Sequence, residues 1–201
     1  MKRTIGLSIA VCAALGFALN GVAAERDASL CCGTKACAMC HKKDDVGNQF
    51  AKWQASPHAK AIETLGTAES KAMAAKVGVT DPQKSGKCLK CHSTAYNFTE
   101  ELQVKAVGDA PAKIVVEDAV TCESCHGPGK NYKAKAVMLD RAQCIANGMV
   151  YPATKSCTLC HNEQSPAWKA DRYTTKDGKK VGFDVEQAYE KIKHPDPAVK
   201  K

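Results

Sequence analysis

The sequence predicts a mainly α-helical chain with extensive loops and little β structure, folded as one domain over residues 25–201. Three observations predict this class. Helix caps and helix breakers recur along the chain, as in Ser56-Pro57 and Asp184-Val-Glu-Gln187. Apolar side chains are too few to build a large core on their own. One five-residue motif occurs four times, and no other repeat is present.

The repeated motif is Cys-x-x-Cys-His, the attachment signature of a c-type haem. One turn of backbone between the cysteines lets both sulfurs reach the two vinyl edges of one porphyrin, and the next residue places its imidazole beneath the ring. In the third copy a Gly-Pro-Gly turn follows at once, which ends a helix and allows close approach to the macrocycle. The attachment cysteines are Cys37, Cys40, Cys88, Cys91, Cys122, Cys125, Cys157 and Cys160, and the proximal iron ligands are His41, His92, His126 and His161.

Zinc ribbons and a thioredoxin-like site explain these motifs poorly. Paired zinc-binding motifs need about 15–20 residues between them, whereas the gaps from Cys40 to Cys88, from Cys91 to Cys122 and from Cys125 to Cys157 are much wider. A thioredoxin-like motif occurs once and needs no histidine after it. We therefore expect four covalently bound haem c groups.

Four haems would also solve the packing problem, because each macrocycle is a large apolar plate. We expect a compact multihaem cytochrome c packed around four covalent haems. A chain of this length has a radius of gyration of roughly 16 Å. Four porphyrins in that volume must lie near contact, and close haems exchange electrons rapidly.

The first 24 residues predict export. Met1-Lys2-Arg3 is cationic, the run 4–19 is apolar and uncharged, and Val22-Ala23-Ala24 offers small residues for cleavage. The apolar run is too short for a membrane span, and Val11 before Cys12 argues against a lipid anchor. The mature chain would be the 201 residues less these 24, 177 residues, in the periplasm or outside the cell.

Three cysteines lie outside the motifs and the first 24 residues. Cys31 or Cys32 could bridge to Cys144, or all three could be buried thiols.

The net charge does not indicate a particular partner. The formal charge of +8 becomes +6 without the leader, and about eight propionates bring the loaded protein near neutral. Scattered lysines and scarce aromatic residues argue against nucleic-acid binding.

Local patterns predict the elements in order. Ser56-Pro57 starts a helix over 57–76 that ends at Gly78, and 81–86 is a turn. Residues 103–106 and 113–117 are the one plausible β pair. A helix over 130–137 and a second, capped by Asp140 and ended by Gly148, precede a helix that runs from Asp184 to Ile192 and stops at His194-Pro-Asp-Pro.

The chain has six histidines, so only His58 and His194 remain as sixth ligands. Four bis-histidine haems would need eight. At least two irons therefore lack a second histidine unless another subunit donates one.

The chain resembles the cytochrome c-554 family, tetrahaem carriers that serve hydroxylamine oxidoreductase in ammonia oxidisers. The matching pieces are Trp53…Ser56-Pro-His58-Ala-Lys-Ala, Cys122-Glu-Ser-Cys-His-Gly-Pro-Gly129 and Cys157…His161-Asn…Ser165-Pro. The resemblance implies His58 on the third haem, His194 on the fourth, and a five-coordinate second haem at His92.

The first haem departs from the family pattern. The family's best-known form supplies a histidine shortly after the Gly-Pro-Gly turn, and residues 130–137 contain none. Met138 is the nearest residue that can bind iron, so we expect a His41/Met138 pair. Met149 or an open site are the alternatives.

Three functions compete. The first is a periplasmic carrier that transfers single electrons between redox partner proteins. The second is a reductase of nitric oxide or a related nitrogen species at an open haem. The third is a subunit of an extracellular cytochrome filament, for which six histidines are too few if every haem is bis-histidine. The carrier is the function that the sequence favours.

Overall fold

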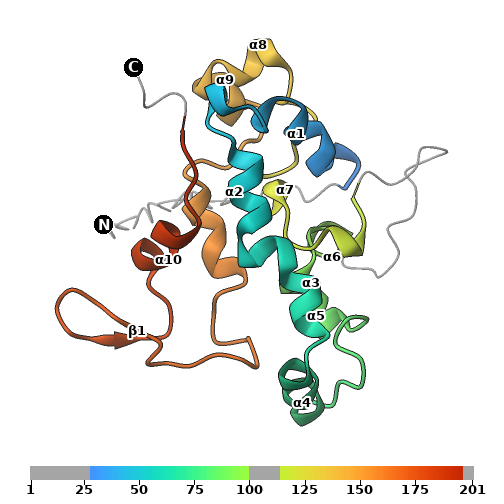
Figure 1. Ribbon diagram of the computed structural model, residues 1–201, viewed down its shortest axis with the longest axis vertical. Coiled ribbons are helices and arrows are strands. Elements are labelled where there is room, and N and C mark those ends of the chain that lie inside the picture. The colour runs from blue at the N-terminus through green and yellow to red at the C-terminus, as the bar shows by residue number, and fades with distance from the viewer. Residues whose placement is uncertain (1–27, 100–113, 197–201) are drawn as a thin grey trace, which may run out of the picture.

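The structure is a computed structural model that describes residues 28–99 and 114–196. Short helices joined by long loops dominate it, and its only sheet within these ranges has two strands (Figure 1). The mainly α-helical class with little β structure is confirmed. The helices are α1 (Thr34–His41), α2 (Gln49–Ala55), α3 (Ala61–Leu65), α4 (Ala68–Lys76), α5 (Gly86–His92), α6 (Thr94–Thr99), α7 (Cys122–His126), α8 (Lys135–Met138), α9 (Arg141–Ala146) and α10 (Val185–Ile192), with 3-10 turns at Ala28–Leu30, Asp44–Val46, Pro57–Lys60, Val116–Asp118 and Ala153–Leu159.

The predicted helix over 57–76 is three segments rather than one. Pro57–Lys60 is a 3-10 turn, and α3 then runs to Leu65. The helix is interrupted at Gly66. The side chain of Thr67 then accepts a hydrogen bond from the backbone N–H of Ser70 and so caps α4. A second capping residue inside the run therefore restarts the helix. The predicted end at Gly78 is confirmed, since α4 stops at Lys76 and Gly78 has φ +72°.

Two predicted caps are confirmed. Asp140 accepts hydrogen bonds from the N–H groups of Ala142 and Gln143 at the start of α9. Asp184 accepts one from Gln187 at the start of α10, which ends at Ile192 as predicted. The helix expected over 130–137 is much shorter, because α8 covers only Lys135–Met138. Tyr132 holds the preceding stretch in a turn by donating its hydroxyl to the carbonyl of Gly127 at 2.7 Å.

The β prediction was wrong where it can be compared. Residues 103–106 lie outside the described ranges, and Val116–Asp118 is a 3-10 turn rather than a strand. The sheet is an antiparallel hairpin of β1 (Tyr173–Thr174) and β2 (Lys180–Val181), with Tyr173 opposite Val181. Asp177-Gly178 makes its turn with Gly178 at φ +84°, a hairpin signal that the sequence carries plainly.

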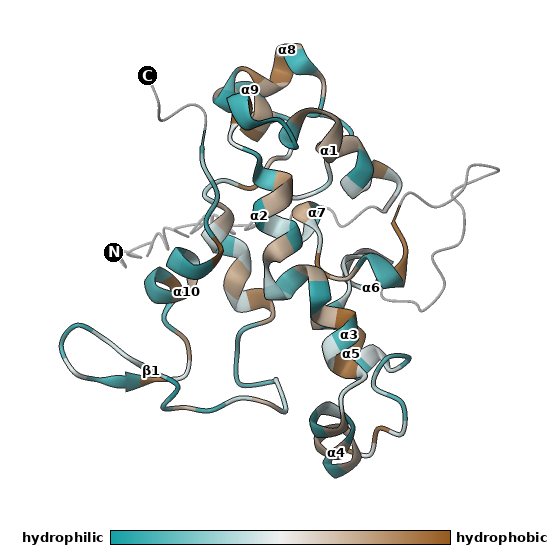
Figure 2. Cartoon of the chain, viewed as in Figure 1, coloured by the Kyte–Doolittle hydropathy of each residue, from teal (hydrophilic) through white to brown (hydrophobic). Residues whose placement is uncertain are grey.

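The chain alone builds only small apolar clusters in its described part. One contains Cys31, Ala95 and Ile114, and another contains Ala61, Ala119 and Val120. Figure 2 shows hydrophilic and hydrophobic residues alternating along most helices, with no broad apolar layer. This agrees with the expectation that apolar side chains are too few for a large core. No helix in the described ranges is both long and apolar enough to cross a membrane.

Candidate haem-binding sites

Each Cys-x-x-Cys-His motif ends a helical segment. The first three motifs close α1, α5 and α7, whose last residues are His41, His92 and His126. The fourth begins at Cys157 inside the 3-10 turn Ala153–Leu159, and its Cys160 and His161 lie just beyond the end of that turn. The helical turn spaces the two cysteines of a motif on one side of the segment and carries the histidine just beyond them. In the third copy Gly127 at φ +76° ends the helix, as its Gly-Pro-Gly sequence predicts.

The cysteines of different motifs lie next to one another. The thiol of Cys37 lies close enough to that of Cys122 to raise the pKa of Cys37 to about 12, which brings the first motif beside the third. The thiol of Cys160 hydrogen-bonds to Cys91 and lowers the pKa of Cys91 to about 7, which joins the fourth motif to the second.

The third and fourth motifs meet as well. Burial raises the pKa of Cys125 to about 11, and the charge of the nearby Cys157 adds to this rise. The hydroxyl of Ser156 donates to the carbonyl of Cys125 at 3.0 Å. The attachment motifs therefore follow one another in space in the order first, third, fourth, second.

Two proximal histidines have their second ring nitrogen engaged. Nδ1 of His41 lies 3.2 Å from Oε1 of Gln49, and Nδ1 of His92 lies 2.8 Å from the carbonyl oxygen of Ala61. A histidine that binds a metal usually donates its other N–H to such an acceptor. The contacts therefore leave Nε2 of each ring for iron.

His126 is kept neutral by its surroundings. Burial, with the positive charges of His194 and His41 nearby, lowers its pKa to about 4. Its Nδ1 is buried and has no hydrogen-bond partner among the described residues. An uncharged imidazole is the form that binds iron, so His126 is ready to act as a ligand at neutral pH.

The two histidines outside the motifs each face a proximal histidine. The ring centres of His58 and His161 are 6.0 Å apart with 68° between the planes, and those of His126 and His194 are 5.8 Å apart with 39°. A metal ion held between two imidazoles has each nitrogen about 2 Å away and each ring centre about 1 Å further, roughly 6 Å in total. Both pairs therefore fit a haem iron between the rings.

These ring contacts differ from the pairing that the family resemblance implied. His58 faces the histidine of the fourth motif rather than the third, and His194 faces the third rather than the fourth. His58 and His194 both lie beside proximal histidines, and their role as sixth ligands stays a prediction.

The backbone around His58 is fixed by the third motif. The indole N–H of Trp53 donates to the carbonyl of Val120 at 2.8 Å, and the N–H of Val120 donates to the carbonyl of His58 at 3.2 Å. Val120 precedes Cys122 by two residues. The Pro57–Lys60 turn is thus held against the start of α7, and the His58 ring projects from it toward His161.

The segment that carries His194 is anchored near the first motif. The side chain of Gln49 donates to the carbonyl of Pro195 at 3.0 Å, and Arg141 forms an ion pair of 2.6 Å with Asp196. Gly47 has φ +101°, and a Cβ there would lie 2.8 Å from the Pro195 ring. Gln49 therefore contacts both the His41 ring and the segment that brings His194 to His126.

His41 and His92 have no second histidine, because both remaining ones are paired elsewhere. Met138, the predicted partner of His41, is half-buried at the end of α8. Figure 1 places α8 at the same end of the molecule as α1. The His41/Met138 pair stays a prediction, and so does the open site at His92.

The three remaining cysteines are thiols in the structure. Cys31 packs against Ala95 and Ile114, whereas the thiol of Cys144 donates to the carbonyl of Val137 at 3.3 Å. The possible bridge from Cys31 or Cys32 to Cys144 is therefore not formed, and the buried-thiol alternative holds. The number of cysteines outside the motifs suggested a bridge but could not locate the partners.

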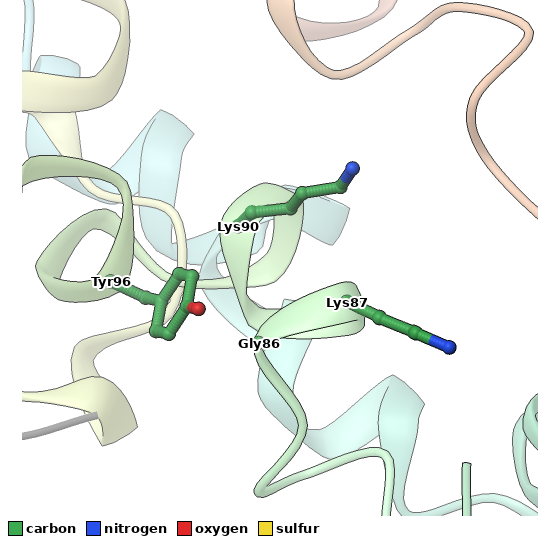
Figure 3. A pocket seen from close by; sticks show the side chains of 4 residues that line it. All are labelled: Gly86, Lys87, Lys90 and Tyr96. Carbon is green, nitrogen blue, oxygen red and sulfur yellow. The ribbon is translucent and has the colours of Figure 1, made fainter. Parts of the chain in front are cut away.

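A pocket lies beside the start of α5. Gly86, Lys87, Lys90 and Tyr96 line it. Figure 3 shows Tyr96 beside the start of α5, with both lysine ammonium groups extending away from it. Lys87 and Lys90 lie on the same helix as Cys88, Cys91 and His92. A Cβ at Gly86 would meet the Tyr96 hydroxyl at 2.0 Å, so only glycine allows this contact.

Sequence reasoning missed Glu123, which lies inside the third motif. Its carboxylate is 1 % exposed and accepts hydrogen bonds from the N–H groups of Cys32, Gly33 and Gly129. A Cβ at Gly129 would lie 2.7 Å from Sγ of Cys32, so glycine permits this close packing. The available signal was an acidic residue between two attachment cysteines.

Comparisons with known proteins indicate the family to which this chain is similar. Residues 36–127 match the family described as cytochrome c554 and c-prime. Cytochrome c-554 of Nitrosomonas europaea is 25 % identical over 181 residues, which cover 80 % of this chain and 72 % of that protein. No solved structure gives a significant match. Together with the motifs, these matches support the cytochrome c-554 family, which implies a c-type cytochrome that carries electrons on covalently bound haem c.

Proposed function

We propose that this chain is exported to the periplasm or beyond, binds four haem c groups at its four motifs, and passes single electrons between redox partner proteins. The observation that carries the proposal is the contact of attachment motifs through their cysteines. Cys37 lies near enough to Cys122, and Cys91 near enough to Cys160, for the neighbouring thiol to shift the pKa of Cys37 and of Cys91. Groups attached to neighbouring side chains lie close together, and short separations favour rapid electron transfer.

Haem iron, when bound, supplies reversible one-electron chemistry whose potential depends on its axial ligands. The chain's own residues attach, orient and insulate the groups. His58 with His161 and His194 with His126 would complete two bis-histidine sites. Gln49 and the carbonyl of Ala61 would fix the rings of His41 and His92 by accepting their Nδ1 protons.

The four sites would not be equivalent. We assign His41 a thioether partner, Met138, and leave the haem at His92 five-coordinate. Thioether sulfur stabilises ferrous iron better than a second imidazole does. The order first, third, fourth, second then sets a methionine-ligated site at one end of the row and an open site at the other.

The open site at His92 is what favours a second function, reduction of nitric oxide or a related nitrogen species. Such an enzyme needs polar groups on the open face of its haem. Among the described residues, no hydrogen bond joins the side chains of Lys87, Lys90 or Tyr96, which line the pocket beside this motif, to the His92 ring. The carrier remains the better supported function, and the filament is disfavoured because only two histidines are free to act as sixth ligands.

A kinetic experiment separates carrier from enzyme. Fully reduced holoprotein is mixed in a stopped-flow instrument with an oxidised monohaem cytochrome c, and in a parallel run with nitric oxide under steady electron supply. The proposal expects rapid oxidation of all haems by the cytochrome and binding of nitric oxide without turnover. Sustained consumption of nitric oxide would replace the carrier by the reductase.

A further inference from the structure

A stack of aromatic rings lies against His161. The ring of Phe183 is parallel to the His161 imidazole, with 4.6 Å between ring centres and 3° between planes. Tyr173 packs edge-on against the Phe183 ring, with 5.9 Å between the ring centres and 87° between the ring planes. The ammonium group of Lys191 lies 5.5 Å from the centre of the Tyr173 ring. The β1–β2 hairpin and α10 thus converge on a single proximal histidine.

The backbone at Phe183 is fixed on both sides. Gly182 precedes it, and a Cβ there would lie 2.0 Å from Cζ2 of Trp168, so only glycine lets the indole pack on this backbone. Asp184 follows it and caps α10 by accepting a hydrogen bond from Gln187. Phe183 therefore stands between a closely packed glycine and a capped helix start, which leaves its ring little freedom to move.

We propose that Phe183 is a positioning residue that sets the rotation of the His161 imidazole and so maintains the 68° angle between His161 and His58. The proposal rests on the proposed axial pair His58/His161. A ligated imidazole can still turn about its bond to iron. The parallel Phe183 ring opposes that turn, because rotation would drive an imidazole edge into the ring face or break the stack.

The angle has a spectroscopic consequence. In low-spin ferric haem the imidazoles donate π density into two iron orbitals. Parallel rings act on the same orbital and split the two strongly, whereas steeply crossed rings reduce the splitting and raise the largest g value in EPR. The His58/His161 pair is crossed at 68° and the His126/His194 pair at 39°. The first should therefore give the component with the larger g value.

Low-temperature EPR of the ferric holoprotein tests this with matched variants. Phe183→Leu removes the flat ring, and Phe183→Tyr keeps it. In Phe183→Leu the component of larger g should broaden and move toward lower g, while the component of the other pair stays unchanged. Phe183→Tyr should retain the wild-type component. His58→Ala identifies the component, because it removes the signal of the pair that contains His58.

The outcomes distinguish the two proposals. If His58→Ala leaves every low-spin component in place, the proposed axial pair fails and this inference fails with it. If His58→Ala removes the component but Phe183→Leu leaves it identical to wild type, the pair stands and the role of Phe183 is wrong. Tyr173→Leu, which removes the edge contact without touching His161, should give a smaller shift in the same direction and serves if Phe183→Leu loses haem.

Discussion

The carboxylate of Glu123 accepts a hydrogen bond of 2.9 Å from the backbone N–H of Cys32, which lies 91 positions earlier in the chain. The same carboxylate accepts bonds of 3.0 Å from Gly33 and 2.7 Å from Gly129. Gly33 precedes α1, and Gly129 follows α7. One buried anion therefore joins the start of the first motif to the end of the third, where Cys37 and Cys122 meet.

Glu123→Gln should destabilise the folded protein. Hydrogen bonds to a charged group contribute about 1.5–3 kcal/mol each. In the glutamine variant the side-chain amide nitrogen would face a backbone N–H group, and because both are donors no hydrogen bond can form between them. We expect the free energy of unfolding to fall by about 2–4 kcal/mol. Urea unfolding of the holoprotein, followed by circular dichroism, measures it. The exposed Glu163→Gln is the control, and equal stability of both variants would contradict the role assigned to Glu123.

The sequence predicted the local features of the sites better than their long-range pairing. Helical turns through the first three motifs and the caps at Asp140 and Asp184 follow from rules that span a few residues. The break at Gly66 was missed because the capping signal of Thr67 lies inside a run that otherwise favours a helix. A single chain carries no local mark of which distant histidines will meet.

The ring contacts of His58 and His194 show why distant pairing is hard to predict from sequence. His194 reaches His126 because Gln49 and Arg141 bind the residues just after it, contacts that span 146 and 55 positions. His58 is fixed through Val120 and so faces the fourth motif. Likewise Cys144 lies among α8 and α9 residues, away from the cluster that holds Cys31, which no cysteine count could indicate.

Alanine at His58 and alanine at His194 should give different spectra. Each change removes one sixth ligand and should convert one haem to a high-spin or exogenously ligated form, leaving the rest low-spin. His58→Ala should remove the component of the 68° pair, and His194→Ala that of the 39° pair. Low-temperature EPR checks both. Loss of the same component in the two variants would show that the histidines do not serve separate irons.

The intact mass of the purified protein should show four haem additions on a chain that begins at Glu25. The first three motifs lie within α1, α5 and α7, and the fourth runs across the end of the 3-10 turn Ala153–Leu159, so each motif keeps two cysteines and a histidine together for one haem. Cys122→Ser with Cys125→Ser should remove one addition, and Cys31→Ser should remove none, because Cys31 packs against Ala95 and Ile114. Three additions in the wild-type protein after correct export would refute the tetrahaem proposal.

The haem that has Met138 as a ligand should have the highest reduction potential among the six-coordinate haems. The His41 ring is oriented by Gln49 and has no second histidine, so a thioether is the ligand that α8 can supply. Thioether ligation raises the reduction potential relative to bis-histidine ligation, because sulfur stabilises ferrous iron. A redox titration of Met138→Ala should therefore lose the most oxidising low-spin component, while the components of the two bis-histidine pairs titrate as in the wild type.

Met149→Ala is the matched control for this titration, since Met149 is the other methionine that follows the third motif. It should leave the high-potential component in place. The reverse result, loss in Met149→Ala alone, would move the sixth ligand to that residue. An unchanged titration in both variants would mean that His41 has no methionine ligand and that Met138 only packs. In that case the first haem would also bind carbon monoxide when reduced, as we expect of the haem at His92, and two binding equivalents would be measured instead of one.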